Sequence, residues 1–155
     1  MASSNGTIWK RHLAENMVFR WQFMADRLVV KLQARTHGWL AIGFNTQDWL
    51  QGTNLIMGAV FDDRTVTVED RYIVEPARRL HQRKRELGAV SRMEAISGSR
   101  SGAVTTIAFR LPTHSTDAYS YDVLPGKAIN VLLAYSRATD FQHHSRVRTH
   151  QSIIL

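Results

Sequence analysis

Gly38-Trp39-Leu40-Ala41-Ile42-Gly43-Phe44 is a short apolar run with a glycine at its start and another near its end. An apolar run of this length between turn residues is typical of a strand that is buried on both faces. Residues 54–61 form a second run of the same kind. The sequence therefore predicts two fully buried strands that lie close together in the chain.

Alternation of apolar and polar residues dominates the segments around these two runs. Leu28, Val30 and Leu32 share one face of a predicted strand, and polar residues such as Lys31 take the other face. Residues 17–24 are a second predicted strand, and residues 25–27 are a predicted turn between the two. The sequence therefore predicts an antiparallel hairpin over residues 17–35.

Further strands are expected along the rest of the chain. They are residues 65–69 continuing to 74, residues 90–97 and 103–110 joined by a glycine-rich connection at 98–102, residues 129–135, and residues 149–155. Residues 77–87 are predicted to be a long loop with one helical turn. Eight to ten short strands with turns between them indicate an all-β fold, an antiparallel immunoglobulin-like β-sandwich whose functional residues lie at its loop-rich ends.

The composition bounds the class of protein. A chain of 155 residues with 44% hydrophobic residues predicts one domain, placed at residues 7–155, with residues 1–6 as an introduced or disordered leader. The absence of cysteine excludes disulfides, c-type haem attachment and iron–sulfur clusters. No apolar run is long enough to span a bilayer.

The net charge of +7 comes largely from arginine. The densest basic cluster is Arg78, Arg79, Arg83, Lys84 and Arg85. A solvated surface is the simpler interpretation of this cluster, and a docking face for an acidic partner is the alternative. No nucleic-acid-binding pattern and no hydrolase motif is present, so the sequence predicts neither a nucleic-acid partner nor an autonomous enzyme.

Five stretches carry a resemblance to a known family. They are residues 38–44, residues 52–60 followed by Asp62-Asp63, Asp70-Arg71-Tyr72, residues 102–110, and Ala134-Tyr135 with the histidine loop that follows. In this order and spacing the chain resembles the DOMON family, β-sandwiches that include haem- or sugar-binding modules and are similar to the cytochrome domain of cellobiose dehydrogenase. The resemblance implies a haem b cofactor, electron transfer with a redox partner protein that has an acidic docking face, and a periplasmic or extracellular location after removal of a signal peptide.

The same resemblance implies the iron ligands. The family's Phe-x-x-His pattern matches Phe141-Gln142-His143-His144, which assigns an axial position to His144 with His143 as its neighbour or substitute. The family's methionine position reads Leu50, which cannot bind iron. Three alternatives follow: another residue completes the coordination, the iron is five-coordinate, or the domain binds no haem.

Several other residues are candidates for the pocket. Met57 and His81 are alternative metal ligands, although a methionine inside an apolar strand more simply fills the core and a histidine among arginines more simply lies on the surface. Arg146 and Arg148 are expected to neutralise haem propionates or to bind an acidic ligand. Trp49 and Phe141 are expected to line a flat apolar pocket.

Two further functions remain open from the sequence. An aromatic-lined cleft with a histidine pair also predicts a module that binds a carbohydrate or another small ligand without haem. A structural or adhesion domain of a larger exported assembly is the third interpretation.

Overall fold

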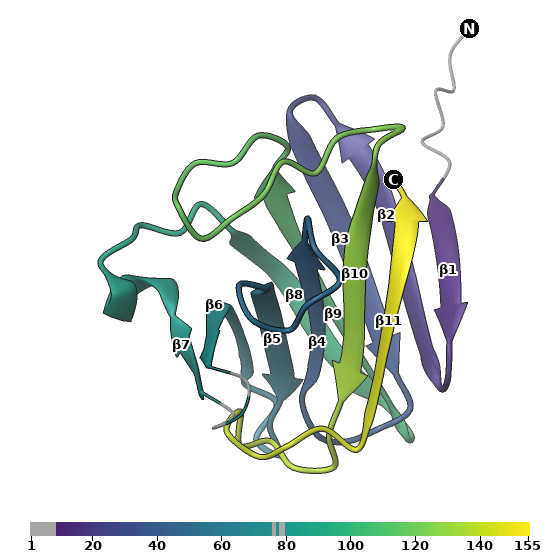
Figure 1. Cartoon of the computed structure of the whole chain (residues 1–155). Helices are drawn as coiled ribbons and strands as arrows, with labels where there is room; N and C mark the ends of the chain where they lie inside the picture. The colour runs from purple at the N-terminus through teal and green to yellow at the C-terminus, as the bar shows by residue number, and fades with distance from the viewer. Residues whose placement is uncertain (1–8, 76, 78–79) are drawn as a thin grey trace, which may run out of the picture.

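The computed structural model describes residues 9–75, 77 and 80–155, and these residues form two antiparallel sheets packed face to face (Figure 1). The predicted all-β sandwich is confirmed. The described residues contain eleven strands, against the eight to ten expected. The predicted leader at residues 1–6 lies outside the described residues.

One sheet has five strands and the other has six. The five-stranded sheet has the order β1 (Lys10–Ala14), β2 (Met17–Met24), β3 (Arg27–Ala34), β9 (Val104–Pro112) and β8 (Glu94–Ser101). The six-stranded sheet has the order β11 (Val147–Ile154), β10 (Ala128–Tyr135), β4 (Leu40–Asn45), β5 (Asn54–Val60), β6 (Val66–Glu75) and β7 (Leu80–Arg83).

Several predicted elements are confirmed. The hairpin over residues 17–35 is β2 and β3, which pair from Met17 with Ala34 to Met24 with Arg27. The two fully apolar runs are β4 and β5, and every residue of both strands is buried. The run at residues 129–135 is β10, which pairs with β4 on one side and β11 on the other.

The predicted glycine-rich connection at residues 98–102 is wrong. Strand β8 continues through it to Ser101, and the chain turns at Gly102, whose φ of 59° suits a tight turn. Gly98 lies inside strand β8. Glycine is needed at this position because a Cβ there would stand 2.6 Å from Cγ1 of Val66. Gly98 therefore marks a close approach between the two sheets. In the sequence, a glycine that allows such packing looks the same as a glycine that forms a turn.

Two strands were missed. Strand β1 pairs with β2 at the edge of its sheet, and its short, mostly exposed sequence has little apolar content. Residues 77–87 were expected to be a loop with one helical turn. The turn exists as the 3₁₀ helix η2 (Lys84–Leu87), but Leu80–Arg83 forms β7 by pairing with β6.

The main core lies between the two sheets. Its largest fully buried side chains include Phe19, Phe44, Phe109, Leu32 and Ile42. A second apolar cluster forms on the opposite face of the six-stranded sheet. An antiparallel sheet commonly leaves one face to solvent, so this second cluster needs its own cover.

Candidate functional site

The second apolar cluster is the floor of a hollow on the outer face of the six-stranded sheet. Strand alternation sends Leu40, Ile42 and Phe44 into the sandwich and Trp39 and Ala41 outward. The outward residues of the neighbouring strands are also apolar: Leu55, Met57 and Ala59 from β5, Ile73 from β6, and Leu132 and Ala134 from β10.

Small side chains leave room at the centre of this floor. Ala41 pairs directly with Ala134 of β10 on one side and with Met57 of β5 on the other. The resulting hollow has a volume of about 130 Å³. It lies over the sheet, whereas the sequence had placed the histidine pair at the mouth of the sandwich.

The loop at residues 137–146 forms one wall and carries the histidine pair. The rings of His143 and His144 are stacked with centroids 4.6 Å apart, and both side chains are exposed and line the hollow. Trp39 Nε1 donates a hydrogen bond to the His143 carbonyl at 3.2 Å, which ties the loop to the floor. The Asp140 carboxylate accepts a bond from the Gln142 backbone N–H at 2.9 Å, so Asp140 shapes the turn before the histidines.

The loop at residues 46–53 forms the facing wall and presents Leu50. Asn45, which is 4% exposed, donates from Nδ2 to the Trp49 and Gln51 carbonyls, both at 3.1 Å. The Gly52 N–H donates to the Ile73 carbonyl at 2.9 Å. Leu50 is thereby held against the apolar cluster and lines the hollow. Asn45 was missed by the sequence reasoning, and the only signal for it is a polar residue at the end of an apolar strand.

His81 of β7 closes the hollow at a third side. Arg71 donates from Nε to His81 Nδ1 at 2.7 Å and from Nη2 to the His81 carbonyl at 3.2 Å, and it also pairs with Glu69. Burial, followed by the positive charge of Arg71, lowers the pKa of His81 from 6.5 to about 4, although a hydrogen bond to the Phe141 backbone opposes this shift. The ring is therefore neutral at pH 7.

The hydrogen bonds of His81 also define its tautomer. Because Nδ1 accepts from Arg71, the neutral ring carries its proton on Nε2. In this arrangement neither nitrogen offers a lone pair to a metal ion.

The predicted site residues do not all come together. Those that line the hollow are His143, His144, Met57, His81 and Arg148. Phe141 is partly buried against the same apolar cluster. Trp49 is 65% exposed and lies outside the lining, and Arg146 faces a different hollow.

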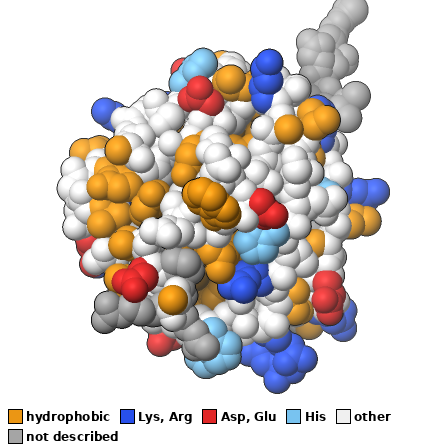
Figure 2. Space-filling model, in the orientation of Figure 1, with side chains coloured by type: hydrophobic (Ala, Val, Ile, Leu, Met, Phe, Trp, Pro, Cys, Tyr) orange, Lys and Arg blue, Asp and Glu red, His pale blue; other side chains and the backbone are white. Residues whose placement is uncertain are grey.

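Arg148 reaches the hollow because its strand pairing places it there. It lies opposite Ala134 in the β10–β11 register, so it shares the outer face with the floor residues. Orange apolar side chains occupy the middle of this face beside basic and histidine side chains (Figure 2). Among the described residues, no three or more His, Asp or Glu side chains gather as a metal site.

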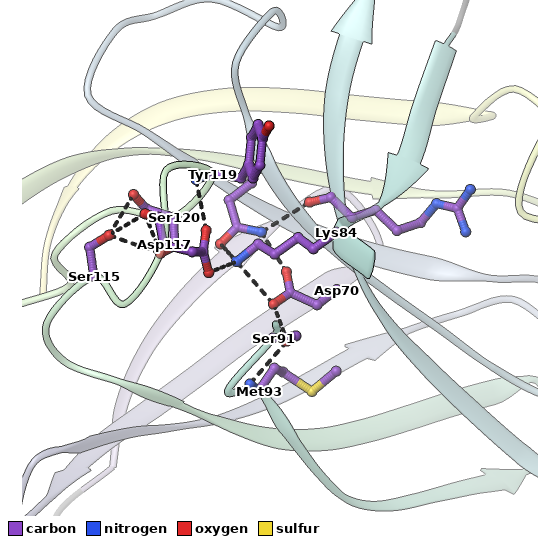
Figure 3. Close-up of polar contacts among 10 residues, drawn as sticks. Asp70, Lys84, Ser91, Met93, Ser115, Asp117, Tyr119 and Ser120 are labelled. Atoms are coloured by element: carbon purple, nitrogen blue, oxygen red, sulfur yellow. Dashed lines mark hydrogen bonds and ion pairs between the residues drawn. The ribbon is translucent and has the colours of Figure 1, made fainter. Parts of the chain in front are cut away.

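The predicted basic cluster is only partly a surface feature. Lys84 is 2% exposed and pairs with Asp70 at 3.0 Å and Asp117 at 3.2 Å (Figure 3). Asp70 also accepts from Asn54 Nδ2 at 2.6 Å and from the Ser91 hydroxyl. Arg83 pairs with Glu86, and Arg78 and Arg79 lie outside the described residues. The interpretation of Lys84 as a solvated or docking residue is wrong, because its side chain is buried. Its ion pairs with Asp70 and Asp117 connect β6 to the loop at residues 113–126.

The fold and the hollow define a β-sandwich module with a sheltered apolar site on one sheet. The chain belongs to the DOMON domain family, whose model matches residues 13–136. It is 28% identical over 123 residues to the human putative DBH-like monooxygenase protein 2, a match that covers 77% of this chain and 23% of that protein. The chain thus spans about a quarter of the length of this relative.

Two solved structures have the same fold. The cytochrome b domain of pyranose dehydrogenase from Coprinopsis cinerea matches with a TM-score of 0.71 and 13% identity, over 94% of this chain and 80% of that one. The cytochrome domain of Myriococcum thermophilum cellobiose dehydrogenase matches with a TM-score of 0.64 and 13% identity, over 90% and 74%. Within the described part of the chain, no helix has the length and apolar character needed to cross a bilayer.

Proposed function

We propose that the hollow binds haem b, with His144 as an axial ligand to the iron, and that the domain exchanges single electrons with a partner protein. The observation that carries this proposal is the apolar outer face of the six-stranded sheet, which is rimmed by an imidazole pair and an arginine. Haem supplies the redox chemistry when bound, and the protein sets its environment.

The residues around the hollow fit a porphyrin in three respects. The floor around Ala41 and Ala134 is apolar, as the face of a macrocycle requires. His143 and His144 offer imidazole nitrogens at the rim. Arg148 offers a guanidinium group that can pair with a propionate.

Size sets a condition on this proposal. The hollow of about 130 Å³ is smaller than the roughly 300–1,000 Å³ typical of sites for larger ligands. Haem therefore requires the loop at residues 137–146 to move away from the sheet. This displacement would break the bond from Trp39 Nε1 to the His143 carbonyl, the bond from the Trp39 N–H to the Ala138 carbonyl, and the packing of Phe141 against the apolar cluster.

The second axial position lacks an obvious protein donor. Leu50 faces the hollow from the opposite wall and has no ligating atom. His81 uses both ring nitrogens in its bonds to Arg71 and to the Phe141 backbone. Bound haem would therefore have His144 as its one protein ligand unless Met57, which is 1% exposed on the floor, also supplied its thioether.

Reconstitution with haem tests the proposal. Purified protein titrated with haem should develop a shifted Soret band with a stoichiometry of one, and His144→Ala should weaken or remove it. His143→Ala distinguishes the two neighbours, Met57→Leu tests the second position, and His114→Ala, whose side chain is 76% exposed elsewhere, is the control. An unchanged band in both His143→Ala and His144→Ala would refute the ligand assignment.

A second candidate function is a binding module without haem. Leu50 in place of an iron ligand and the small volume favour this alternative. The ligand would be a carbohydrate or another small molecule, with the exposed ring of Trp49 as a stacking surface beside the hollow. A sugar titration that changes Trp49 fluorescence in a protein that takes up no haem would support this function, and the Trp49→Ala variant should lose the response.

The partner and the location belong to the same proposal. We propose a redox partner with an acidic face, because the chain carries a net charge of +7, and a place of action in the periplasm or outside the cell. Electron transfer to such a partner should slow as salt is raised, since screening weakens the attraction between the two proteins. The domain itself is proposed as a carrier and not as an enzyme.

A further inference from the structure

Three arginines from two connections line a second hollow. Both connections lie at the lower end of the molecule in Figure 1. Arg35 follows β3, Arg137 comes shortly after β10, and Arg146 directly precedes β11. His37, between β3 and β4, also lies on the lining. We call this the arginine hollow; its volume is about 430 Å³, within the range of known ligand sites.

The charge of this lining has one sign. It contains Arg35, Arg137, Arg146 and His37, and no acidic residue. Within the described ranges, none of the three guanidinium groups lies in an ion pair. A concave surface of one sign concentrates its electrostatic potential and attracts counter-ions. Basic side chains also gather along the lower edge of Figure 2.

The more buried cationic side chains of the protein differ from the arginines of this hollow, because each has an acidic partner. Arg71, Lys84 and Arg100 each have a carboxylate within ion-pair distance. The fold thus neutralises these buried cations, whereas no carboxylate of the described residues forms an ion pair with the three arginines of the hollow.

Neutral groups of the hollow add hydrogen-bond donors and hold its shape. Tyr135 Oη accepts a bond from Asn16 Nδ2 at 3.2 Å, so the phenol O–H is left to donate. The Arg35 N–H bonds to the Asn16 carbonyl at 3.0 Å and the Arg146 N–H to the Tyr135 carbonyl at 2.8 Å. The His37 ring is fixed by a 2.9 Å bond between Nε2 and the Gly102 carbonyl. In the haem-free protein the backbone at Arg35 and Arg146 is therefore anchored.

We propose that the arginine hollow is a binding site for a phosphate or sulfate monoester. Guanidinium groups present forked N–H donors that match the oxygens of such groups in pairs. Three of them match the three terminal oxygens of such a group better than the two oxygens of a carboxylate, and the volume leaves room for the molecule that carries the ester. This hollow is different from the one under the histidine pair, although the loop at residues 137–146 contributes to both, and it does not require haem.

A titration of the haem-free 155-residue chain, followed by ¹H–¹⁵N NMR, tests this site. Inorganic phosphate, inorganic sulfate, glucose 6-phosphate and glucose 6-sulfate are added at constant ionic strength, with sodium chloride as the reference. Saturable amide shifts are expected at residues 16, 35–37, 103, 135–137 and 146. The ester that binds more tightly identifies which of the two groups the site prefers.

Matched arginine variants separate a built site from general charge. Arg35→Gln and Arg146→Gln should each weaken binding by about fivefold, as loss of one exposed charged hydrogen-bond donor predicts. Arg85→Gln removes the same charge from an exposed position on η2 and should leave the affinity unchanged. These side chains are exposed, so their removal leaves no buried cavity, and the NMR spectrum itself verifies the fold.

Two outcomes would overturn the proposal. Shifts equal to those caused by chloride, or spread evenly over the basic surface, would show that no specific site exists. An equal loss of affinity in Arg85→Gln would show that only net charge matters. Neither result bears on the haem titration, which uses a different hollow and a different signal.

Discussion

Replacement of Lys84 by methionine should strongly destabilise the protein. The side chains of Lys84, Asp70 and Asp117 are 3%, 3% and 9% exposed, and Lys84 is the ion-pair partner of both carboxylates. Removing one member of a buried ion pair leaves uncompensated charge and costs about 3–5 kcal/mol. The remaining bonds of Asp70 to Asn54 and Ser91 place the expected loss near 3 kcal/mol.

The size of this effect is large against the whole stability of a domain, which is roughly 5–15 kcal/mol. Urea denaturation at pH 7 should show the loss as a lower midpoint, and the melting temperature should fall by roughly 10 °C. Arg85→Met is the matched control, because it removes an exposed cation from the same 3₁₀ helix and should change stability by no more than about 0.5 kcal/mol.

The double variant Lys84→Met/Asp70→Asn isolates the cause. Removing one of the orphaned charges should recover part of the loss, since the asparagine Oδ1 can still accept from Asn54 Nδ2 while its Nδ2 donates to the Ser91 hydroxyl. A Lys84→Met variant that costs less than about 1 kcal/mol would show that the loop at residues 113–126 does not depend on this ion pair. A double variant no better than the single one would show that packing, and not charge, explains the loss.

Three further predictions concern the walls of the histidine hollow. Between about pH 6.5 and 4 the unfolded chain binds a proton at His81 that the folded chain does not. As the pH is lowered through this range, the free energy of unfolding should therefore fall by ~1–2 kcal/mol after allowance for partial exposure. Urea denaturation at several pH values should show a weaker pH dependence in His81→Gln. Gly38→Ala should cost at least ~2 kcal/mol in thermal unfolding, because its Cβ would stand 2.1 Å from the Ser136 carbonyl oxygen, whereas a value below ~1 kcal/mol would contradict the close packing. Trp39→Phe removes the bond to the His143 carbonyl and should cost ~1 kcal/mol, with faster amide hydrogen exchange at residues 140–144; unchanged exchange would show that this bond does not restrain the loop.

The sequence was most informative where periodicity alone decides an element. The alternation at residues 17–35 and the apolar runs at 39–44 and 54–61 correspond to β2, β3, β4 and β5. It was least informative where a residue type serves two roles. Gly98 packs against Val66 within a strand, although glycine equally indicates a turn.

The candidate site was predicted in part. His143, His144, Met57, His81 and Arg148 were named from the sequence, and the structure brings all five to one hollow. Asn45, which organises the facing loop, was missed, because its role depends on carbonyls that only the folded loop gathers around its amide.

Residue spacing and side-chain type determined by themselves that the chain is an all-β sandwich, since strand periodicity is a local property of the chain. Only the tertiary structure decided which face of which sheet carries the hollow, that His81 is neutral with its proton on Nε2, and that Lys84 is buried between two carboxylates. The first and the last of these depend on segments that are distant in the chain, β4 with β10 and η2 with the loop at residues 113–126, and the second depends on how β7 pairs with β6. Local sequence cannot specify such meetings, because the charge, protonation and exposure of a side chain are set by the neighbours that the fold provides.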